Sequence, residues 1–233
     1  RSQPLPLSWS QQRLWFLDQF EPGAGAAYLV PVALRLRGQL DVGALQWALD
    51  QLFLRHDSLR TVFVTQAGAG RQVLLRAPLA FPLTRHAGVV CGEALSARLA
   101  QLARQPFVLD GGAAGTPLVR GDLFCLDDRQ ADSLHVLFLN MHHIITDGWS
   151  LGIVARELAA LYAARCQGGD SVSGVLPPLP LQYADYALWQ RQGFGAGGGG
   201  EEEEALAFWR GQLEGAPVLL ELPTDRPRPA VQS

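Results

Sequence analysis

The feature that most constrains the fold is a nearly unbroken apolar run from Leu134 to Met141. An apolar run of this length predicts a strand that is buried on both faces of a sheet. The polar segment His142 to Gly148 follows at once, with two imidazoles, a carboxylate and a glycine. Because imidazole and carboxylate groups exchange protons near neutral pH, this strand end is a candidate for proton-transfer chemistry.

The pattern on either side of the run predicts further strands interleaved with helices. Asp41 offers an N-cap for a helix with an apolar stripe, and Leu151 to Leu161 carries a second stripe after the histidines. Residues 93–104 have the composition of a helix. We expect strands over residues 28–37, 59–64, 72–75, 118–126 and 133–141. This order predicts an α/β (α+β) sandwich with a mixed sheet flanked by helices.

Size and charge narrow the class of protein. The 233 residues allow one sizeable domain or two small lobes, and the net charge of -3 argues against nucleic-acid binding. No apolar run approaches the ~20 residues that cross a bilayer.

Cys91, Cys125 and Cys166 are far apart, and we expect Cys125 and Cys166 to be small buried thiols in a reducing cytoplasm. The start at Arg1 instead of Met suggests a piece of something longer.

A change in composition marks a boundary late in the chain. Residues 168–180 are rich in Gly, Ser and Pro, as in a linker or a crossover between lobes. Amphipathic helices are expected over residues 181–192 and 202–213. The glycine tract Gly193–Gly200 between them runs into Glu201–Glu204 and predicts a flexible surface loop.

Strand geometry separates the two histidines. If the strand continues, period-two alternation sends His142 and His143 to opposite faces, so one faces a substrate and the other packs inside. Asp147 could orient a histidine, cap the following helix or pair with an arginine. Gly148 permits a positive φ and leaves room for a ligand.

A metal site and a serine triad are two other kinds of site that these residues suggest. Opposed ring directions and a single nearby carboxylate, Asp147, disfavour a metal site. A serine triad would need a GxSxG elbow, and Ser150 lacks that context.

Four segments in order resemble the motifs of condensation domains of nonribosomal peptide synthetases. His142–Ser150 resembles the HHxxxDG motif, shorter versions of which occur in carnitine, chloramphenicol and dihydrolipoyl acyltransferases. The other three segments narrow the resemblance to condensation domains; they are Leu7–Leu17, Arg55–Phe63 and Gln182–Trp189.

The resemblance implies a chloramphenicol-acetyltransferase-like lobe and only the first half of a domain that normally has two. It places the N-terminal lobe at residues 1–175 and the lobe crossover with the start of the C-terminal lobe at residues 176–233. The missing C-terminal lobe and neighbouring synthetase domains are implied partners.

The resemblance implies that a donor acyl or peptidyl thioester meets the amine of an aminoacyl thioester. Both arrive on phosphopantetheine arms of donor and acceptor carrier proteins, so no cofactor binds directly. His143 would orient the amine and take its proton, while His142 supports it from inside. Asp147 and Arg60 would be structural ion-pair residues, and Gly148 would keep the tunnel open beside His143.

Details of the motifs refine these expectations. The segment Thr146–Ser150, with Trp149, resembles elongating domains that take an L-configured donor. Asp57 departs from the Glu that the family usually has at this position.

Two other functions are alternatives to amide formation. One is a non-catalytic lobe that docks carrier proteins, and the other is an acyltransferase that uses coenzyme A thioesters. The remaining motif residues are expected to pack or to contact the other lobe; they are Arg13, Trp15, Tyr183, Asp185 and Trp189.

Overall fold

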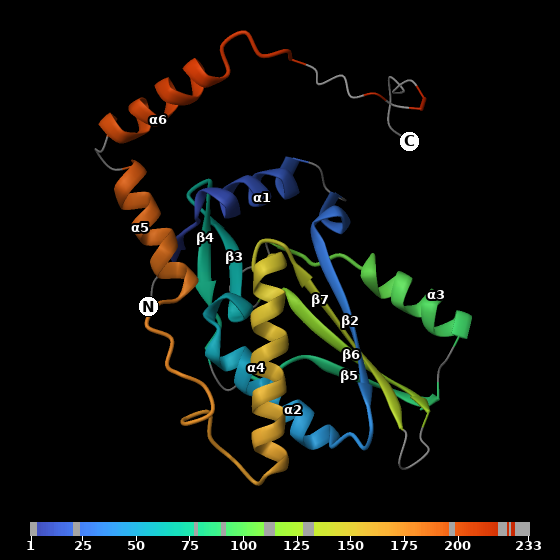
Figure 1. Ribbon diagram of the computed structural model, residues 1–233. Coiled ribbons are helices and arrows are strands. Elements are labelled where there is room, and N and C mark those ends of the chain that lie inside the picture. The colour runs from blue at the N-terminus through green and yellow to red at the C-terminus, as the bar shows by residue number, and fades with distance from the viewer. Residues whose placement is uncertain are drawn as a thin grey trace. The chain divides into compact units, whose positions relative to one another are not determined.

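The computed structural model describes residues 4–20, 24–76, 79–89, 92–109, 115–127, 133–195, 199–218, 223, 225 and 226. Contacts between Cα atoms divide the chain into two compact units, Arg1–Arg191 and Gln192–Ser233. Within the described residues, the first unit contains a four-stranded sheet and a three-stranded sheet with helices packed against them (Figure 1).

Strand β7 (Leu134–His142) lies inside the larger sheet, whose strand order is β2-β7-β6-β5. It pairs antiparallel with β2 (Leu29–Arg37) and β6 (Val119–Asp127), whereas β5 (Leu83–Val89) runs parallel to β6. The side chains of residues 136–142 are all buried. The sheet is therefore mixed, and the predicted strand buried on both faces is confirmed.

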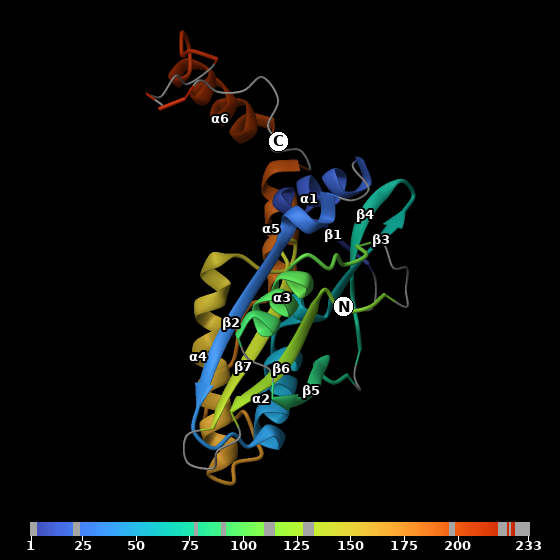
Figure 2. The same ribbon diagram turned by 90° about the vertical axis from the view of Figure 1, so that its right-hand side faces the viewer.

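Helices cover both faces of this sheet (Figure 2). Alternate residues of β7, such as Leu137 and Leu139, join the main core with α2 (Val42–Arg55) and α4 (Gly148–Cys166). The intervening residues pack with α3 (Gly92–Ala103) in a smaller cluster that contains Val136, Phe138 and Leu102. The chain therefore has the predicted α/β sandwich fold.

Helix α2 shows why the local sequence folds as it does. The Asp41 side chain accepts a hydrogen bond from the Ala44 backbone N–H at 2.8 Å and so caps the helix. The apolar stripe predicted after this cap is buried in the main core; its members are Leu45, Ala48, Leu49, Leu52 and Phe53.

The smaller sheet has the order β1-β4-β3. Its strands are β1 (Leu5–Pro6), β3 (Thr61–Gln66) and β4 (Ala69–Leu74). Ala67 and Gly68 form the turn between β3 and β4, with φ values of 51° and 76°. Positive φ at both central positions is the geometry that suits a two-residue hairpin.

Strand β3 begins later than the sequence predicts. Residues 57–60 form a 3₁₀ turn instead of the start of a strand, because the Arg60 side chain bonds back to Asp57 and the Leu54 carbonyl. Strand β5 was not predicted at all, since polar residues such as Arg85 interrupt its apolar pattern.

Helix α1 (Trp9–Phe20) lies against the hairpin of the smaller sheet. Gly70 of β4 permits this approach, because an added Cβ would lie 2.7 Å from Leu7 Cδ1 and 2.9 Å from Trp15 Cδ2. Trp15 packs on the main core, in agreement with its expected packing role.

The prediction of a loop over Gly193–Gly200 is wrong at both ends of this range, where the structure has helices. Helix α5 (Tyr183–Gly195) continues into the tract, and α6 (Gly199–Gln212) begins within it. The block Glu201–Glu204 lies in the first turns of α6, and glutamate is a residue of high helix propensity. Residues 196–198 lie outside the described residues.

Cys125 and Cys166 are free thiols, and Cys166 is exposed at the end of α4, which corrects its expected burial. Cys91 lies outside the described residues. Among the helices that the structure describes, none has the length and apolar character needed to span a membrane.

Candidate active site

The two histidines stand where β7 gives way to a turn. The His142 N–H donates to the Leu118 carbonyl at 2.9 Å, and the His143 N–H donates to the Tyr28 carbonyl at 2.7 Å. Backbone hydrogen bonds to the residues that immediately precede β6 and β2 therefore fix the two histidines. The imidazoles separate, because His142 is 1% exposed whereas His143 is exposed and lines a pocket.

His142 is a buried neutral imidazole. Its Nδ1 accepts a hydrogen bond from the Ile144 N–H at 3.0 Å, which places the proton of the neutral ring on Nε2. Burial, followed by the nearby His143, lowers the pKa of His142 from 6.5 to about 4. At neutral pH this ring carries no charge and holds the turn that positions His143.

Asp147 caps helix α4. Its Oδ1 accepts hydrogen bonds from the Ser150 N–H at 2.8 Å and from the Ser150 hydroxyl at 2.6 Å. These bonds, led by the hydroxyl, hold the pKa of Asp147 below its ordinary value. Of the three roles open from the sequence, the structure gives Asp147 the cap, and it forms no ion pair within the described part of the chain.

Gly148 is the first residue of α4, and its φ is not positive. An added Cβ would meet no heavy atom within 4 Å. The positive φ that the sequence allowed is therefore not used here, and the space beside this residue is open.

Arg60 does form an ion pair, with Asp57 at 2.7 Å. Its guanidinium also donates to the carbonyl oxygens of Leu54 and Leu75, at 3.1 and 3.0 Å. This largely buried fork ties the end of α2 to the end of β4, which gives Arg60 a structural role.

A pocket of about 480 Å³ opens beside His143. One wall is α1, a second is the turn after His143, and Tyr183 of α5 closes a third. Its lining residues are Ser10, Gln11, Arg13, Leu14, Leu17, Tyr28, Ser58, His143, Ile144, Ile145, Thr146, Asp147, Ser150 and Tyr183. Tyr28, Ser58 and Gln11 had no functional signal in the sequence, because only the fold brings them together.

Two residues expected to pack or to contact the other lobe, Arg13 and Tyr183, also line this pocket. Burial raises the pKa of the Tyr183 hydroxyl, which therefore stays protonated at neutral pH. Asp185 accepts a bond from the Gln182 N–H at 2.9 Å at the start of α5, and Trp189 is 63% exposed.

A buried chain of hydrogen bonds supports the turn after His143. The Gln11 Nε2 donates to the Ile144 carbonyl at 3.4 Å and to Gln72 Oε1 at 3.3 Å, while Gln11 Oε1 accepts from the Ser8 N–H at 3.0 Å. The Ser8 and Tyr183 hydroxyls share a bond of 2.9 Å. Gln11 thus connects α1, β4 and the histidine turn, and through Ser8 it is linked to Tyr183.

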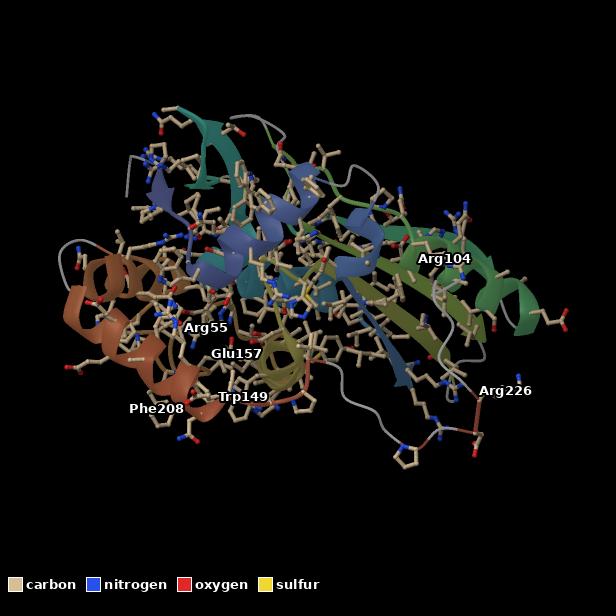
Figure 3. The ribbon with its side chains drawn as sticks, turned by 90° about the horizontal axis from the view of Figure 1, so that it is seen from above. Arg55, Arg104, Trp149, Glu157, Phe208 and Arg226 are labelled. Atoms are coloured by element: carbon tan, nitrogen blue, oxygen red, sulfur yellow. The ribbon has the colours of Figure 1, made fainter. Side chains whose placement is uncertain are left out.

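Polar contacts also connect the second motif segment to α4 and to the fourth motif segment. Glu157 accepts from Arg55 Nε at 3.0 Å and pairs with His56 Nε2 at 2.7 Å (Figure 3). Gln182 accepts from the Asp57 N–H at 3.1 Å and donates to the Arg55 carbonyl at 3.0 Å. Residues from all four motif segments also line the pocket beside His143.

This arrangement supplies an exposed imidazole, a carboxylate committed to a cap, and hydroxyls along the pocket wall. Among the described residues, no three His, Cys, Asp or Glu side chains gather as a metal would require. The exposed imidazole of His143 and the hydroxyls beside it are groups that can orient a polar substrate and transfer a proton.

The fold is an α/β sandwich with a mixed sheet, and its histidine motif lies at the end of a central strand beside a pocket. The model of the condensation domain family matches residues 1–233, and the chain belongs to that family.

Relatives and solved structures agree with this assignment. Malpibaldin synthetase of Mortierella alpina is 46% identical over 238 residues, which cover 100% of this chain and 4% of that protein. The X-domain in its complex with OxyB from teicoplanin biosynthesis has a TM-score of 0.79 and 35% identity, over 99% of this chain and 48% of that chain. The first condensation domain of the CDA synthetase shares the fold, with a TM-score of 0.75 and 21% identity over 96% of this chain and 53% of that chain. The chain thus spans about half of each solved chain.

Proposed function

We propose that residues 1–175 are the N-terminal lobe of a condensation domain and that residues 176–233 are its crossover and the start of a C-terminal lobe. The length supports this reading, because the chain covers 48% of the solved X-domain chain. So does the surface of the first unit, where large aromatic side chains are exposed on α1 and α5, among them Phe20 and Trp189. Exposed apolar groups of this size are typical of surfaces that another part of a protein covers.

The reaction that we propose is amide formation in nonribosomal peptide synthesis. The amine of an aminoacyl thioester attacks the carbonyl carbon of a donor acyl or peptidyl thioester. A C–N bond forms, the C–S bond breaks, one proton leaves the amine, and the departing thiolate is protonated. The observation that carries this proposal is that His143, the second histidine of the segment that resembles HHxxxDG, is exposed in a pocket of a chain from the condensation domain family.

His142 is unsuited to this role because its ring is buried and its Nδ1 already accepts a backbone hydrogen bond. The His143 side chain, in contrast, is exposed and lines the pocket. Because His142 stays neutral at pH 7, it places no fixed positive charge beside the incoming amine.

His143 would act mainly by orienting the amine. An α-amine has a pKa near ~8, so a useful fraction is already neutral at pH 7. Holding the nitrogen in line with the thioester carbonyl then contributes more than removing its first proton. His143 can still take the proton that the nitrogen loses as the amide forms.

The substrates would arrive on phosphopantetheine arms of donor and acceptor carrier proteins, and the lobe itself would bind no cofactor. Neighbouring synthetase domains and the C-terminal lobe would be its other partners. Trp149, which is 84% exposed at the start of α4, belongs to the motif form that suggests an L-configured donor.

A non-catalytic docking lobe is a second candidate. It is favoured by the similar X-domain, which is described in a complex with another protein, OxyB. An acyltransferase that uses coenzyme A thioesters is a third candidate, because the motif alone is shared with that class.

The decisive experiment measures amide formation between two carrier-loaded substrates by this chain together with the rest of its domain. His143→Ala should abolish most product, whereas Gln19→Ala, at an exposed position of α1, should not. Circular dichroism and a carrier-binding titration establish that the variant is folded.

Unchanged turnover by His143→Ala would contradict the catalytic role. Carrier binding without product in the unmodified protein would favour docking, and product from coenzyme A thioesters would favour the third candidate.

A further inference from the structure

A second, smaller cavity of about 70 Å³ adjoins the main pocket. The two cavities share Ser58, Ile145, Thr146 and Ser150, so these residues form the boundary between them. We call the smaller cavity the annex. Its volume suits a group of a few non-hydrogen atoms, because a single water needs ~10–15 Å³ of such space.

Thr146 lies at this boundary and carries a buried hydroxyl that is not used within the described residues. The residue is 7% exposed, and its Oγ1 has no hydrogen-bond partner among the described residues. Thr61 is a matched case, since it is 5% exposed and its Oγ1 donates to the Asp57 carbonyl at 2.8 Å. Burying a hydroxyl without a hydrogen-bond partner is energetically unfavourable. A ligand group that forms a hydrogen bond with the Thr146 hydroxyl would therefore gain more binding free energy than the same group gains from a hydrogen bond in water.

The other polar walls of the annex are neutral hydroxyls or groups that are already paired. The Ser150 hydroxyl donates to Asp147, which leaves its oxygen free to accept a bond. His56 also lines the annex, but its Nε2 is held by Glu157, whose carboxylate is shared with Arg55. A charged ligand group would therefore lack a free counter-ion in the annex, and burying it would be unfavourable.

Apolar side chains complete the annex. Leu59 is 5% exposed and Val154 is 9% exposed, and Ile153 lies beside them. These residues would contact the carbon atoms of a short side chain while the hydroxyls contact its polar end. The combination suits a neutral hydroxyalkyl group better than a purely apolar or a charged one.

We propose that the annex receives the short hydroxyl-bearing side chain of one aminoacyl substrate, of the serine or threonine class, and that Thr146 determines this specificity. The proposal rests on the function proposed above, because the main pocket must hold the rest of the aminoacyl group. Thr146 is then a specificity-determining residue that takes no part in the bond-making step.

The test compares two isosteric probes that cannot react, the amide analogues of threonyl- and valyl-N-acetylcysteamine. Each is titrated into this chain, and nuclear magnetic resonance follows the Thr146 methyl group and the His143 ring. We expect the threonyl probe to bind about tenfold more tightly than the valyl probe, equivalent to about 1.4 kcal/mol. Thr146→Val should remove this preference, whereas the control Thr61→Val should retain it.

The possible outcomes bear differently on the specificity of the annex and on the proposed function. Equal binding of both probes with a shifted His143 ring, or a preference that survives Thr146→Val, would overturn the annex and leave the proposed function standing. Binding of neither probe would count against both. Ser58→Ala gives an independent check on the annex wall, with a smaller loss of the threonyl preference expected because a second hydroxyl remains.

Discussion

At the scale of single residues, burial decides which of two adjacent histidines can act. Period-two alternation predicted their separation, but it could not say which ring faces inside. The fold settles this through Leu118 and Tyr28, whose carbonyls fix the backbone of the two histidines, and through the layers that bury His142. The sequence likewise left Asp147 with three roles, and the helix it begins selects one of them.

The lowered pKa of His142 makes stability depend on pH. The folded pKa of about 4 lies below the ordinary value of 6.5, so the unfolded chain binds more protons between these values. The stabilisation is therefore present above pH 6.5 and is lost as pH falls toward 4, by up to ~1.4 kcal/mol per pH unit. Chemical denaturation of the chain across this range should show the fall, and His142→Asn should flatten it. An equal slope in both proteins would contradict the assignment.

Two buried threonines should respond oppositely to the same change. Thr61→Val removes a satisfied hydrogen bond and should lower the free energy of unfolding by about 1 kcal/mol. Thr146→Val removes a hydroxyl without a partner among the described residues and should be neutral or stabilising. Urea denaturation of both variants measures the difference, and a comparable loss in each would indicate that Thr146 has a partner in solution.

At the scale of elements, local capping and packing patterns were predictable and irregular segments were not. Helix α2 follows from its cap and apolar stripe, and α3 from its composition. The parallel strand β5 and the 3₁₀ turn Asp57–Arg60 depend on partners far along the chain or on one side chain's bonds. No periodicity in the sequence reports such interactions.

The cap of α4 provides a prediction at this scale. Asp147→Ala should lower the free energy of unfolding by about 1 kcal/mol, because the backbone N–H of Ser150 loses its acceptor. Asp147→Ser should recover most of that loss, since serine also caps helices. Thermal denaturation distinguishes the two. If both variants lose the same stability, the carboxylate has a role beyond the cap.

Gln11 is expected to position the histidine turn. Gln11→Leu leaves the Ser8 N–H and the Ile144 carbonyl without their partner and should cost about 1–3 kcal/mol of stability. In the amide-forming assay it should reduce turnover, because the turn that carries His143 is less well held. Gln19→Leu, an exposed change on the same helix, is the matched control. Wild-type turnover by Gln11→Leu would show that this amide does not position the turn.

At the scale of the whole molecule, the chain spans about half of the solved domains that it resembles. The first unit exposes two pairs of aromatic side chains in contact, Phe16 with Phe20 on α1 and Tyr186 with Trp189 on α5. Side chains of this kind on a surface favour association with another surface.

We therefore expect the isolated chain to self-associate in solution. Light scattering should report species larger than 25.3 kDa, and Phe20→Glu with Trp189→Glu should shift them toward the monomer. Leu206→Glu, on α6, serves as a control for added charge. A clean monomer at high concentration would count against the half-domain proposal.

The sequence alone determined the family, the central buried strand and the separation of the histidines, because motifs and periodicity are local properties of the chain. The tertiary structure decided which ring is buried, that Asp147 caps a helix, and that Gln11, Tyr28, Ser58 and Tyr183 share a pocket with His143. The shared pocket depends on contacts between residues more than a hundred positions apart, such as Gln11 with Ile144 and Ser8 with Tyr183. Such contacts exist only once the layers have packed, and therefore no local pattern encodes them.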